Sequence, residues 1–285
     1  MADSAVNIYA KEFSDNIMML ARQKASVMMS KVMLKPSIKG NKFTQERIGK
    51  WTMATKSQGV VSTPENDPDY SRRTCTMVTK HDTRILARDE ELKTVVEVTS
   101  PWVQAAVASY GKEIDLAVYN ALGGNAFSGV DGGTTVALPA AQKLATVAGE
   151  VLDTDFIVDV KTKLDAADVP AEGRMVMINP TDLNEMLRDT TLTSTDYNSI
   201  KALIRGEFNT WMGFEWISTT AATAGKCYFF QKDGVVLGLN ETPYVKIDER
   251  ADKSYAQQIY YELNLGATRL EEERVVEVTI TAASA

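Results

Sequence analysis

The sequence has a single histidine and only two cysteines among its 285 residues. A Ser-His-Asp or Cys-His catalytic device would therefore have to use His81, and a metal site built from several histidines is excluded. His81 lies in a polar stretch, which is typical of an exposed surface residue. Cys75 and Cys227 are far apart in the sequence and form neither a disulfide framework nor a CxxC metal motif. Few side chains are thus available for nucleophilic or metal chemistry.

The chain also lacks a basic excess and any long hydrophobic run. It has 31 Lys and Arg against 38 Asp and Glu, a formal net charge of -7, whereas dedicated nucleic-acid binders are usually basic. The apolar stretch from Ile17 to Leu20 is followed by Arg22 and Lys24, so it is neither a signal-peptide core nor close to the roughly 20 residues that span a bilayer. We expect an intracellular, soluble protein with no membrane association.

What remains is ordinary globular composition, with 44% hydrophobic and 24% charged residues. This length allows one large domain or two intermediate ones. Apolar residues recur at helical spacing from Asp3 to Leu34, which predicts a long N-terminal helix packed either on its own chain or on a neighbour. Residues 37–80 then become polar and strand-like, and predict a long β-hairpin with arms Glu46–Met53 and Arg72–Lys80.

This predicted hairpin has few large apolar side chains. They are Ile48, Trp51, Met53 and Met77. Since isolated hairpins are only marginally stable in water, we expect this one to pack against another element or another subunit.

The middle of the chain predicts helices and strands in alternation. Ser100-Pro101 supplies an N-cap and a first-turn proline, and Gly123-Gly124 ends a helix of about 22 residues. Residues 123–133 contain several glycines but no phosphate-binding motif, and are interpreted as a flexible loop. A helix capped at Asp153, a buried strand at 174–178 and a helix from Pro180 follow.

The last third predicts strands. They are expected at 214–218 and 226–230, followed by a hairpin turn at 232–234 into strand 235–237. Alternating apolar residues from Ile259 to Leu265 and from Val275 to Ile280, separated by Gly266-Ala267, predict a long terminal hairpin.

Clusters of charged side chains have simpler explanations than catalysis. Asp153, Asp155 and Asp159 suit the positive end of a helix dipole better than a cation site. The acidic runs at 89–91 and 271–273 indicate solvated faces or subunit contacts. A basic group without interleaved aromatic rings favours ion pairs between chains over a nucleic-acid platform. Its members are Arg72, Arg73, Lys80, Arg84 and Arg88.

One stretch carries a family resemblance. Helix 156–165 is followed by Asp168-Val169-Pro170-Ala171-Glu172-Gly173-Arg174, a strand through Val176 and Ile178, Asn179-Pro180 and a second helix. Residues 200–206 and Gly213-Phe214 complete the pattern. This order resembles the major capsid proteins of tailed bacteriophages, a fold shared with encapsulins and the floor of herpesvirus shells, and the likeness extends loosely over nearly the whole chain.

The resemblance implies an α+β fold with five parts. These are an N-terminal arm at 1–44, an extended β-hairpin loop at 45–82, a peripheral domain at 83–134 and 241–285 that includes a long spine helix at 100–122, and an axial domain at 135–240. It implies a structural protein without catalytic, cofactor or metal residues. Copies would assemble as hexamers and pentamers into an icosahedral shell around phage double-stranded DNA, in the virion, after assembly in the host cytoplasm.

In such shells the extended loop lies across a neighbouring subunit. The implied intersubunit contacts are Trp51, Met53, Arg72, Arg73, Met77, Phe13 and Ile17. Trp51 and Met77 are expected to be buried by another copy. Implied partners are a separately encoded scaffolding protein, a portal protein and DNA bound without sequence recognition. Some relatives crosslink a loop lysine to an asparagine of another subunit; Lys50 and Lys56 lie in a plausible loop, but we expect no crosslink.

Two other functions fit parts of the sequence. An encapsulin-type cellular compartment would use the same fold around a protein cargo. An α/β enzyme with a carboxylate site at residues 153–180 is a remote alternative, disfavoured by the missing catalytic motifs and by the hairpin that lacks its own core.

Overall fold

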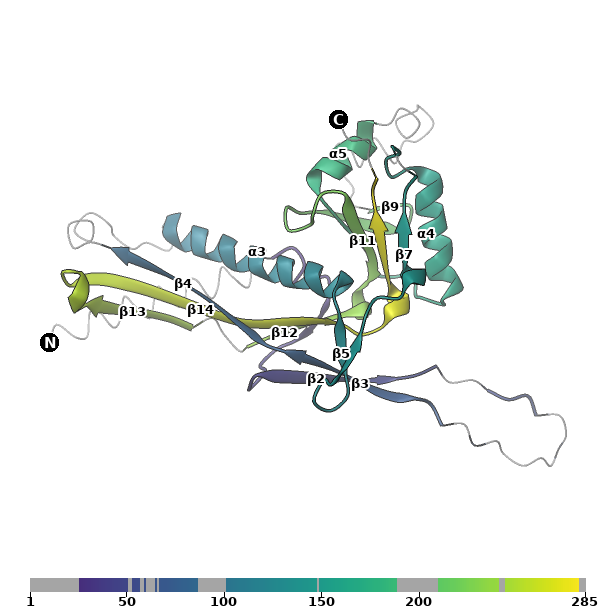
Figure 1. The fold of residues 1–285 in the computed structure, drawn as a ribbon, viewed down its shortest axis with the longest axis horizontal. Helices are drawn as coiled ribbons and strands as arrows, with labels where there is room; N and C mark the ends of the chain where they lie inside the picture. The colour runs from purple at the N-terminus through teal and green to yellow at the C-terminus, as the bar shows by residue number, and fades with distance from the viewer. Residues whose placement is uncertain are drawn as a thin grey trace.

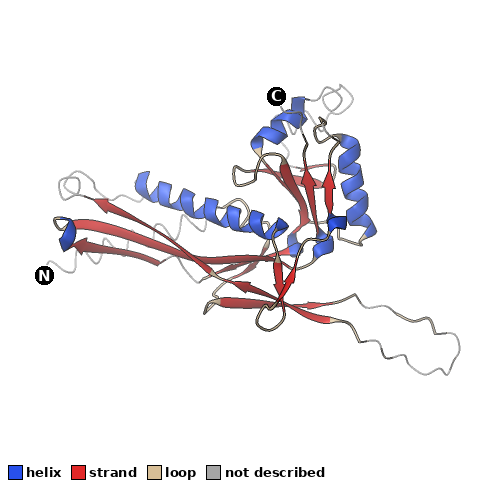
Figure 2. Cartoon of the chain, in the orientation of Figure 1, coloured by secondary structure: helices blue, strands red, loops and turns tan. Residues whose placement is uncertain are grey.

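The computed structural model describes residues 26–50, 53–56, 59, 65, 67–86, 101–147, 149–188, 210–240 and 244–281. These residues form an α+β structure of three sheets and a long helix, with a two-stranded ribbon that projects from one end (Figure 1). Two long strands of one sheet, which we call the long sheet, run below the long helix in Figure 2. A second sheet with two helices, which we call the compact sheet, lies beyond one end of that helix. No helix in the described part of the chain is long and apolar enough to cross a membrane.

The long sheet, which has five strands, is organised by one long strand, β14 (Ala256–Arg269). It pairs with β4 (Val78–Leu86) on one side and with β13 (Tyr244–Arg250) and β12 (Val235–Leu239) on the other, and β1 (Met33–Lys35) extends the sheet parallel to β12. Helix α3 (Pro101–Gly123) lies along β14, which confirms the spine helix predicted at 100–122. A short helical turn, η3 (Ala251–Lys253), joins β13 to β14.

The six-stranded sheet has the order β7-β15-β11-β8-β10-β9. Its strands are β7 (Lys143–Ala145), β15 (Val275–Thr279), β11 (Lys226–Gln231), β8 (Arg174–Ile178), β10 (Phe214–Ser218) and β9 (Thr210–Trp211). Helices α4 (Thr154–Ala166) and α5 (Pro180–Arg188) flank it, as the sequence predicted. The Asp153 side chain accepts a hydrogen bond of 2.8 Å from the Phe156 amide, which confirms the predicted N-cap.

The third sheet contains the predicted hairpin. Strands β2 (Lys42–Ile48) and β3 (Tyr70–Thr76) pair antiparallel in the register Lys42–Thr76 to Ile48–Tyr70. Strands β5 (Ala126–Ser128) and β6 (Thr134–Val136) continue this sheet beyond β3. The interpretation of residues 123–133 as only a flexible loop is therefore wrong, because part of that segment is a strand. Turn η1 (Ala140–Gln142) leads on to β7.

Two hydrophobic cores lie on opposite faces of the six-stranded sheet. In the first, Ile114, Val118 and Leu122 of α3 pack with side chains of both the long and the six-stranded sheet. In the second, Ile157, Val160 and Leu164 of α4 pack on the six-stranded sheet. The spacing of these six residues, three or four apart, is what places each triplet on one helix face.

Three sequence expectations are wrong. The N-terminal helix does not extend to Leu34, because β1 begins at Met33; Met28 and Val32 are buried in the chain's own core. Residues 232–234 form a short helical turn, η2, between two different sheets and not a hairpin turn. The terminal hairpin does not form either, since β14 and β15 belong to different sheets and are joined through a turn, η4 (Glu272–Arg274).

The expected domain boundaries remain a prediction, but two strands pair across them. β12 precedes residue 240 and lies in the long sheet, whereas β15 follows it and lies in the compact sheet, between β7 and β11. The chain therefore passes between these sheets at η2 and again at η4.

Gly123 provides a test of how α3 meets the compact sheet. A Cβ atom at this position would lie 1.9 Å from the Tyr228 hydroxyl oxygen, so Gly123→Ala forces one element to shift. We expect a loss of about 1–3 kcal/mol in the free energy of unfolding, measured by urea denaturation of the unassembled chain.

Tyr228→Phe removes the closest atom, so it should reduce the cost of Gly123→Ala in the double variant. Gly133→Ala is the matched control because nothing lies within 4 Å of its added Cβ. Equal effects of Gly123→Ala and Gly133→Ala would contradict this packing.

Candidate functional site: the hairpin arm and its arginine anchor

The most distinctive feature of the surface is the hairpin arm, which we define as residues 42–76: β2, β3 and the segment that joins them. Its two described strands project away from the rest of the chain (Figure 1). Beyond its root the arm exposes apolar side chains: Ile48 is 62%, Tyr70 73% and Met53 99% exposed. A two-stranded ribbon is marginal in water, so this exposed outer part has little of its own chain to stabilise it.

The root of the arm, in contrast, is firmly packed. Phe43 of β2 and Cys75 of β3 join Ile38, Val236 and Leu270 in a separate hydrophobic cluster. Met77, directly after β3, is 5% exposed in this cluster. The expectation that another copy buries Met77 is therefore wrong: its own chain does so, because β3 passes beside β12 and the end of β14.

Charged side chains attach the arm to the segment that follows β14. Arg73 of β3 is 3% exposed. Its Nη2 donates to Glu272 Oε1 at 2.5 Å, and its Nε donates to the Leu270 carbonyl oxygen at 3.2 Å. Arg47 of β2 reaches the other carboxylate oxygen of Glu272 at 3.4 Å. We call Arg47, Arg73, Arg269 and Glu272 the arginine anchor.

Arg269, the last residue of β14, is fully buried. Its Nη1 donates to the carbonyl oxygens of Leu122 and Gly124, at 3.0 and 2.8 Å, where α3 ends. Its Nη2 donates to the Val136 carbonyl oxygen of β6 at 3.1 Å, and its Nε lies 3.8 Å from Glu272. Cations are favoured at a helix C-terminus, whose carbonyl groups have no intrahelical partners.

Burial lowers the pKa of Arg73 and of Arg269, and the nearby Glu272 carboxylate opposes this in both cases. The positive charge of Arg47 further lowers the pKa of Arg73, and that of Arg73 further lowers the pKa of Arg269. Glu272 thus compensates the charge of a buried cluster that is otherwise entirely basic.

The other basic residues of this region also find partners within the chain. Arg72 pairs with Glu46 across the arm at 2.7 Å, and Lys80 pairs with Glu113 of α3 at 3.5 Å. The expectation of an ion-pair network between chains is wrong for the buried Arg73. Arg72 and Lys80 combine an intrachain ion pair with a partly exposed side chain, so for them it stays a prediction. Arg88 lies outside the described residues.

The acidic run at 271–273 is not merely a solvated face. Glu271 forms an ion pair with Arg274, and Glu273 lies 3.1 Å from Lys50 of the arm. The run at 89–91 lies outside the described residues. Sequence reasoning missed Glu272 and Arg269 as site residues; their only local signal is the spacing of opposite charges three residues apart.

The predicted contact residues separate into three groups. Arg72, Arg73 and Met77 lie on or beside β3, where Arg73 and Met77 are buried and Arg72 is partly exposed. Met53 is almost fully exposed beyond the end of β2. Trp51, Phe13 and Ile17 lie outside the described residues.

The carboxylates of the predicted enzyme site do not come together around a shared site. Asp153 caps α4, whereas Asp155 and Asp159 are exposed on that helix. Within the described ranges, no three His, Cys, Asp or Glu side chains form a group suited to a metal ion. His81 is exposed on β4, as predicted. Both thiols are buried, and burial raises the pKa of Cys75 to about 11 and that of Cys227 further, so neither is activated as a nucleophile.

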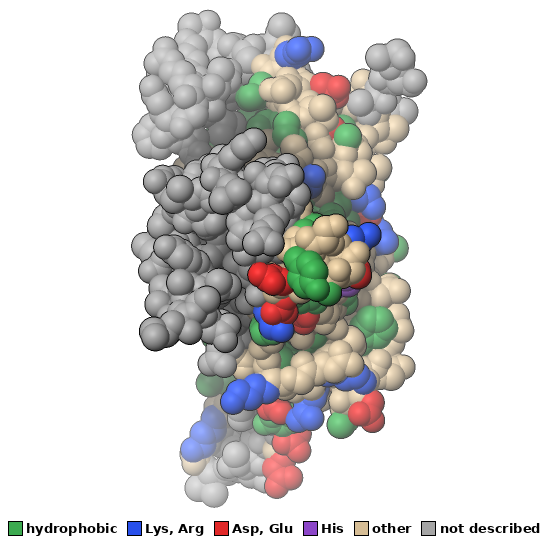
Figure 3. Space-filling model, turned by 90° about the vertical axis from the view of Figure 1, so that its left-hand side faces the viewer, with side chains coloured by type: hydrophobic (Ala, Val, Ile, Leu, Met, Phe, Trp, Pro, Cys, Tyr) green, Lys and Arg blue, Asp and Glu red, His purple; other side chains and the backbone are tan. Residues whose placement is uncertain are grey.

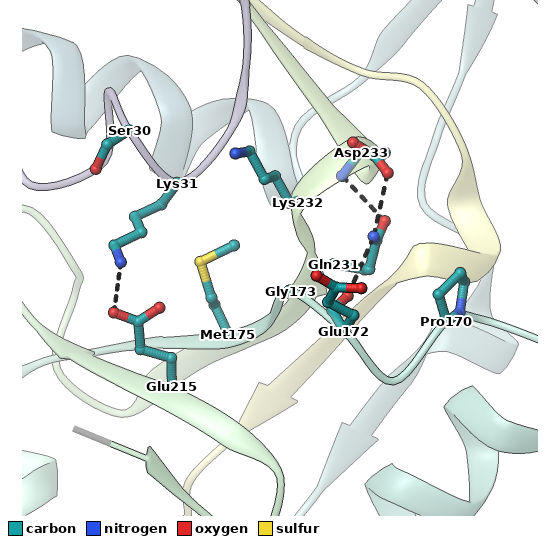
Figure 4. Close-up of a pocket in the computed structure, with 10 residues that line it drawn as sticks. All are labelled: Ser30, Lys31, Pro170, Glu172, Gly173, Met175, Glu215, Gln231, Lys232 and Asp233. Carbon is teal, nitrogen blue, oxygen red and sulfur yellow. Dashed lines mark hydrogen bonds and ion pairs between the residues drawn. The ribbon is translucent and has the colours of Figure 1, made fainter. Parts of the chain in front are cut away.

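A surface pocket lies where the N-terminal segment meets the compact sheet (Figure 4). Lys31 and Glu215 pair across one side of it at 2.6 Å, and on the other side Gln231 bonds to Asp233 at 3.2 Å. Met175 lies between them. Its lining mixes lysines with carboxylates, of which Lys31 and Glu215 form an ion pair, so the pocket offers no concentrated charge of one sign.

Seen from the end where β4 and β13 end and β14 begins, acidic and basic side chains are interspersed with hydrophobic ones on the described part of the surface (Figure 3). This pattern does not form a continuous basic stripe of the kind that binds nucleic acid. The arm and its anchor are therefore the strongest candidate for a functional site.

Comparisons with known proteins concern the family and the fold of the chain. A family model described as "Phage capsid protein" matches residues 5–282. No curated protein sequence gives a significant match. Among solved structures, the capsid of Ralstonia phage GP4 aligns with a TM-score of 0.68 at 12% identity, over 92% of this chain and 92% of that chain.

Two further structures show the same likeness. The cyanophage Pam1 capsid aligns with a TM-score of 0.65 at 10% identity, covering 92% of this chain and 93% of that chain. A virus-like particle from Pyrococcus furiosus aligns with a TM-score of 0.61 at 12% identity, covering 94% and 98%. At these identities the structures show the fold alone, and they confirm the α+β fold class that the sequence predicted.

The anchor predicts that substitution of Arg73 destabilises the chain more than substitution of its neighbour Arg72. Arg73→Met leaves Glu272 without its closest partner inside a buried cluster, so we expect a loss of about 3 kcal/mol in the free energy of unfolding. Arg72→Met removes an exposed ion pair with Glu46, and should cost less than about 1 kcal/mol. Urea denaturation of the unassembled chain measures both. Similar small losses for the two variants would show that Arg73 is not held by its own chain.

Proposed function

Because this chain belongs to the phage capsid protein family as a structural major capsid protein, we propose that its copies assemble as hexamers and pentamers into an icosahedral shell around double-stranded phage DNA. Self-assembly into the capsid of the virion follows from the family. The capsomer types, the enclosed DNA and assembly in the host cytoplasm belong to the proposal.

The observation that supports this proposal best is the hairpin arm. Its root is packed and ion-paired, whereas Ile48, Met53 and Tyr70 are exposed along its outer part. A single chain gains nothing from holding such side chains in water. A neighbouring copy that covers them gains the free energy of burying their apolar surface, about 25 cal/mol per Å².

We assign the contact residues accordingly. Trp51, Met53 and Arg72 are proposed to contact a neighbour through the arm, and Phe13 and Ile17 through the N-terminal arm. Arg73 and Met77, which are buried within the chain, would support the arm from its root and not touch the neighbour.

The parts of the shell protein are proposed as follows. The N-terminal arm is 1–44 and the extended loop 45–82. The axial domain of 135–240 would gain β15, and the peripheral domain, with α3, would gain β12, because these strands pair in those sheets. The compact sheet with α4 and α5 would meet other copies around the capsomer axis.

The partners of the shell follow from the same proposal. A separately encoded scaffolding protein would guide assembly, and a portal protein would occupy one vertex. With a net charge of -7, the shell would confine DNA by its geometry, without sequence recognition and without a strong electrostatic grip. No enzymatic activity is part of this function.

An encapsulin-type compartment is the second candidate, because the virus-like particle from Pyrococcus furiosus aligns over 94% of this chain. The content of purified particles separates the two. Extracted double-stranded DNA supports the phage shell, whereas a stoichiometric protein cargo without DNA supports the compartment.

The outer part of the arm can be tested by side-chain truncation. We expect Trp51→Ala and Met53→Ala to reduce the yield of closed shells at least several-fold, while circular dichroism of the unassembled chain stays near that of the parent. Lys56→Ala, an exposed residue of the same segment, is the control and should assemble normally. Electron microscopy and light scattering measure the yield; loss of the fold in the unassembled Trp51→Ala chain would instead mean that its own chain buries Trp51.

Covalent joining of subunits is a separate prediction. The Lys50 amine donates to the Ala167 carbonyl oxygen at 3.1 Å and pairs with Glu273 at 3.1 Å. We expect denaturing gel electrophoresis of assembled shells to show a single band at 31.3 kDa. A ladder of covalent multimers would contradict the expectation that no crosslink forms.

A further inference from the structure

Glu272 is contacted from two sides by parts of the fold that are distant in the sequence. It lies in turn η4, between the end of the long sheet and the start of the compact one. Its Oε1 accepts from Arg73, which is 199 residues away. One carboxylate therefore connects the arm to the point where the chain passes from one sheet to the other.

Both strands of the arm contribute to this contact. Arg47 pairs with Ser71 across the hairpin, and Gln45 pairs with Arg73. Since residues two apart in a strand share a face, Arg47 and Arg73 lie on the same face of the ribbon. Glu272 binds one with each carboxylate oxygen, which resists rotation of the ribbon about either contact alone.

On its other side, Glu272 faces the end of the long helix. Arg269 lies 3.8 Å from Glu272 and donates to the carbonyl oxygens of Leu122 and Gly124. The path from the end of α3 to the arm thus runs through Arg269, Glu272 and Arg73. Each step is an ion pair or a charge-assisted hydrogen bond.

Little solvent is available to replace these contacts. The side chains of Arg73, Arg269 and Glu272 are 4%, 0% and 13% exposed. Three guanidinium groups lie beside this one carboxylate, so its loss removes the negative charge that opposes their mutual repulsion at the root of the arm. The hydrophobic root cluster of Phe43, Cys75 and Met77 does not depend on this charge.

From this geometry we propose that Glu272 is a positioning residue for assembly: it fixes the direction of the hairpin arm relative to the end of α3. The proposal rests on the proposed function, in which the arm contacts a neighbouring subunit. Without the carboxylate the arm remains attached through its hydrophobic root, but its direction is no longer set. An arm that points in many directions meets its neighbour less often in the orientation needed for closure.

The test measures arm direction in the folded, unassembled full-length chain. Spin labels are placed at Met53→Cys, on the arm, and Lys112→Cys, on α3; both residues are exposed. The native thiols are buried, and the same chain without added cysteines serves as the labelling blank. Pulsed electron paramagnetic resonance then gives the distribution of distances between the two labels.

Glu272→Gln should at least double the width of this distribution and lower the yield of closed shells at least five-fold. Glu271→Gln is the matched control: it removes the same charge from the adjacent position, whose ion-pair partner is Arg274 and not the arm. It should leave both the width and the yield unchanged. A parental distance distribution in folded Glu272→Gln would overturn the proposal, since a merely structural role changes stability without widening the distribution.

A second variant keeps the test decisive if Glu272→Gln does not fold. Arg47→Gln removes the most exposed member of the anchor, whose side chain is 29% exposed, and should widen the distribution to a smaller extent. An unchanged width in this variant would then overturn the proposal. The positioning proposal and the proposed function fail on different results. Widened distances with a normal shell yield for Glu272→Gln would refute positioning for assembly. A normal yield for both Trp51→Ala and Met53→Ala would refute the proposed contact of the arm.

Discussion

Two arginine side chains that are almost completely buried, Arg73 and Arg269, impose the constraint on which the arrangement of this chain depends. Moving a guanidinium group out of water is costly unless its charge and its donors are matched. The fold meets this requirement with Glu272 and with backbone carbonyl oxygens at Leu270, Leu122, Gly124 and Val136. The exception is the Arg269 Nε, which lies 3.8 Å from Glu272 and has no hydrogen bond. Satisfying the other donors requires the arm, the end of α3, strand β6 and turn η4 to come together, so these elements are placed by one shared cluster of charges.

The root of the hairpin arm is packed against the chain, whereas its outer part is exposed to solvent. The root combines apolar contacts, as at Phe43 and Met77, with the arginine anchor. The outer part leaves Ile48, Met53 and Tyr70 in water. A monomer would be expected to shorten such a ribbon, because exposed strands and apolar side chains favour association with other chains. In a shell protein that tendency is the useful property, provided that the root directs it toward a neighbouring subunit.

Local signals in the sequence predicted the helices well and the pairing of distant strands poorly. The cap at Asp153 and the glycine at the end of α3 act within a few residues, so they can be recognised without the fold. Gly266 was expected in a turn, but it lies inside β14, where a Cβ atom would be 3.1 Å from the Cys75 sulfur and from the Thr76 carbonyl oxygen. The glycine is required for close packing of two strands. Alternating apolar residues identify a strand but not its partner, so β14 and β15 were wrongly joined as a hairpin.

The anchor was beyond sequence reasoning for a related reason. Arg73 was recognised as part of a basic region, yet its partner is 199 residues away and only the folded chain brings the two together. Turn η4, which contains that partner, also ends at Arg274, directly before the first residue of β15. The segment from Arg269 to Val275 therefore sets two directions at once: that of the arm, through Glu272, and that of the compact sheet, through β15. Because the same segment, residues 269–275, and the end of α3 determine both directions, the arm and the compact sheet keep a fixed relation within a subunit, which a closed shell of repeated subunits requires.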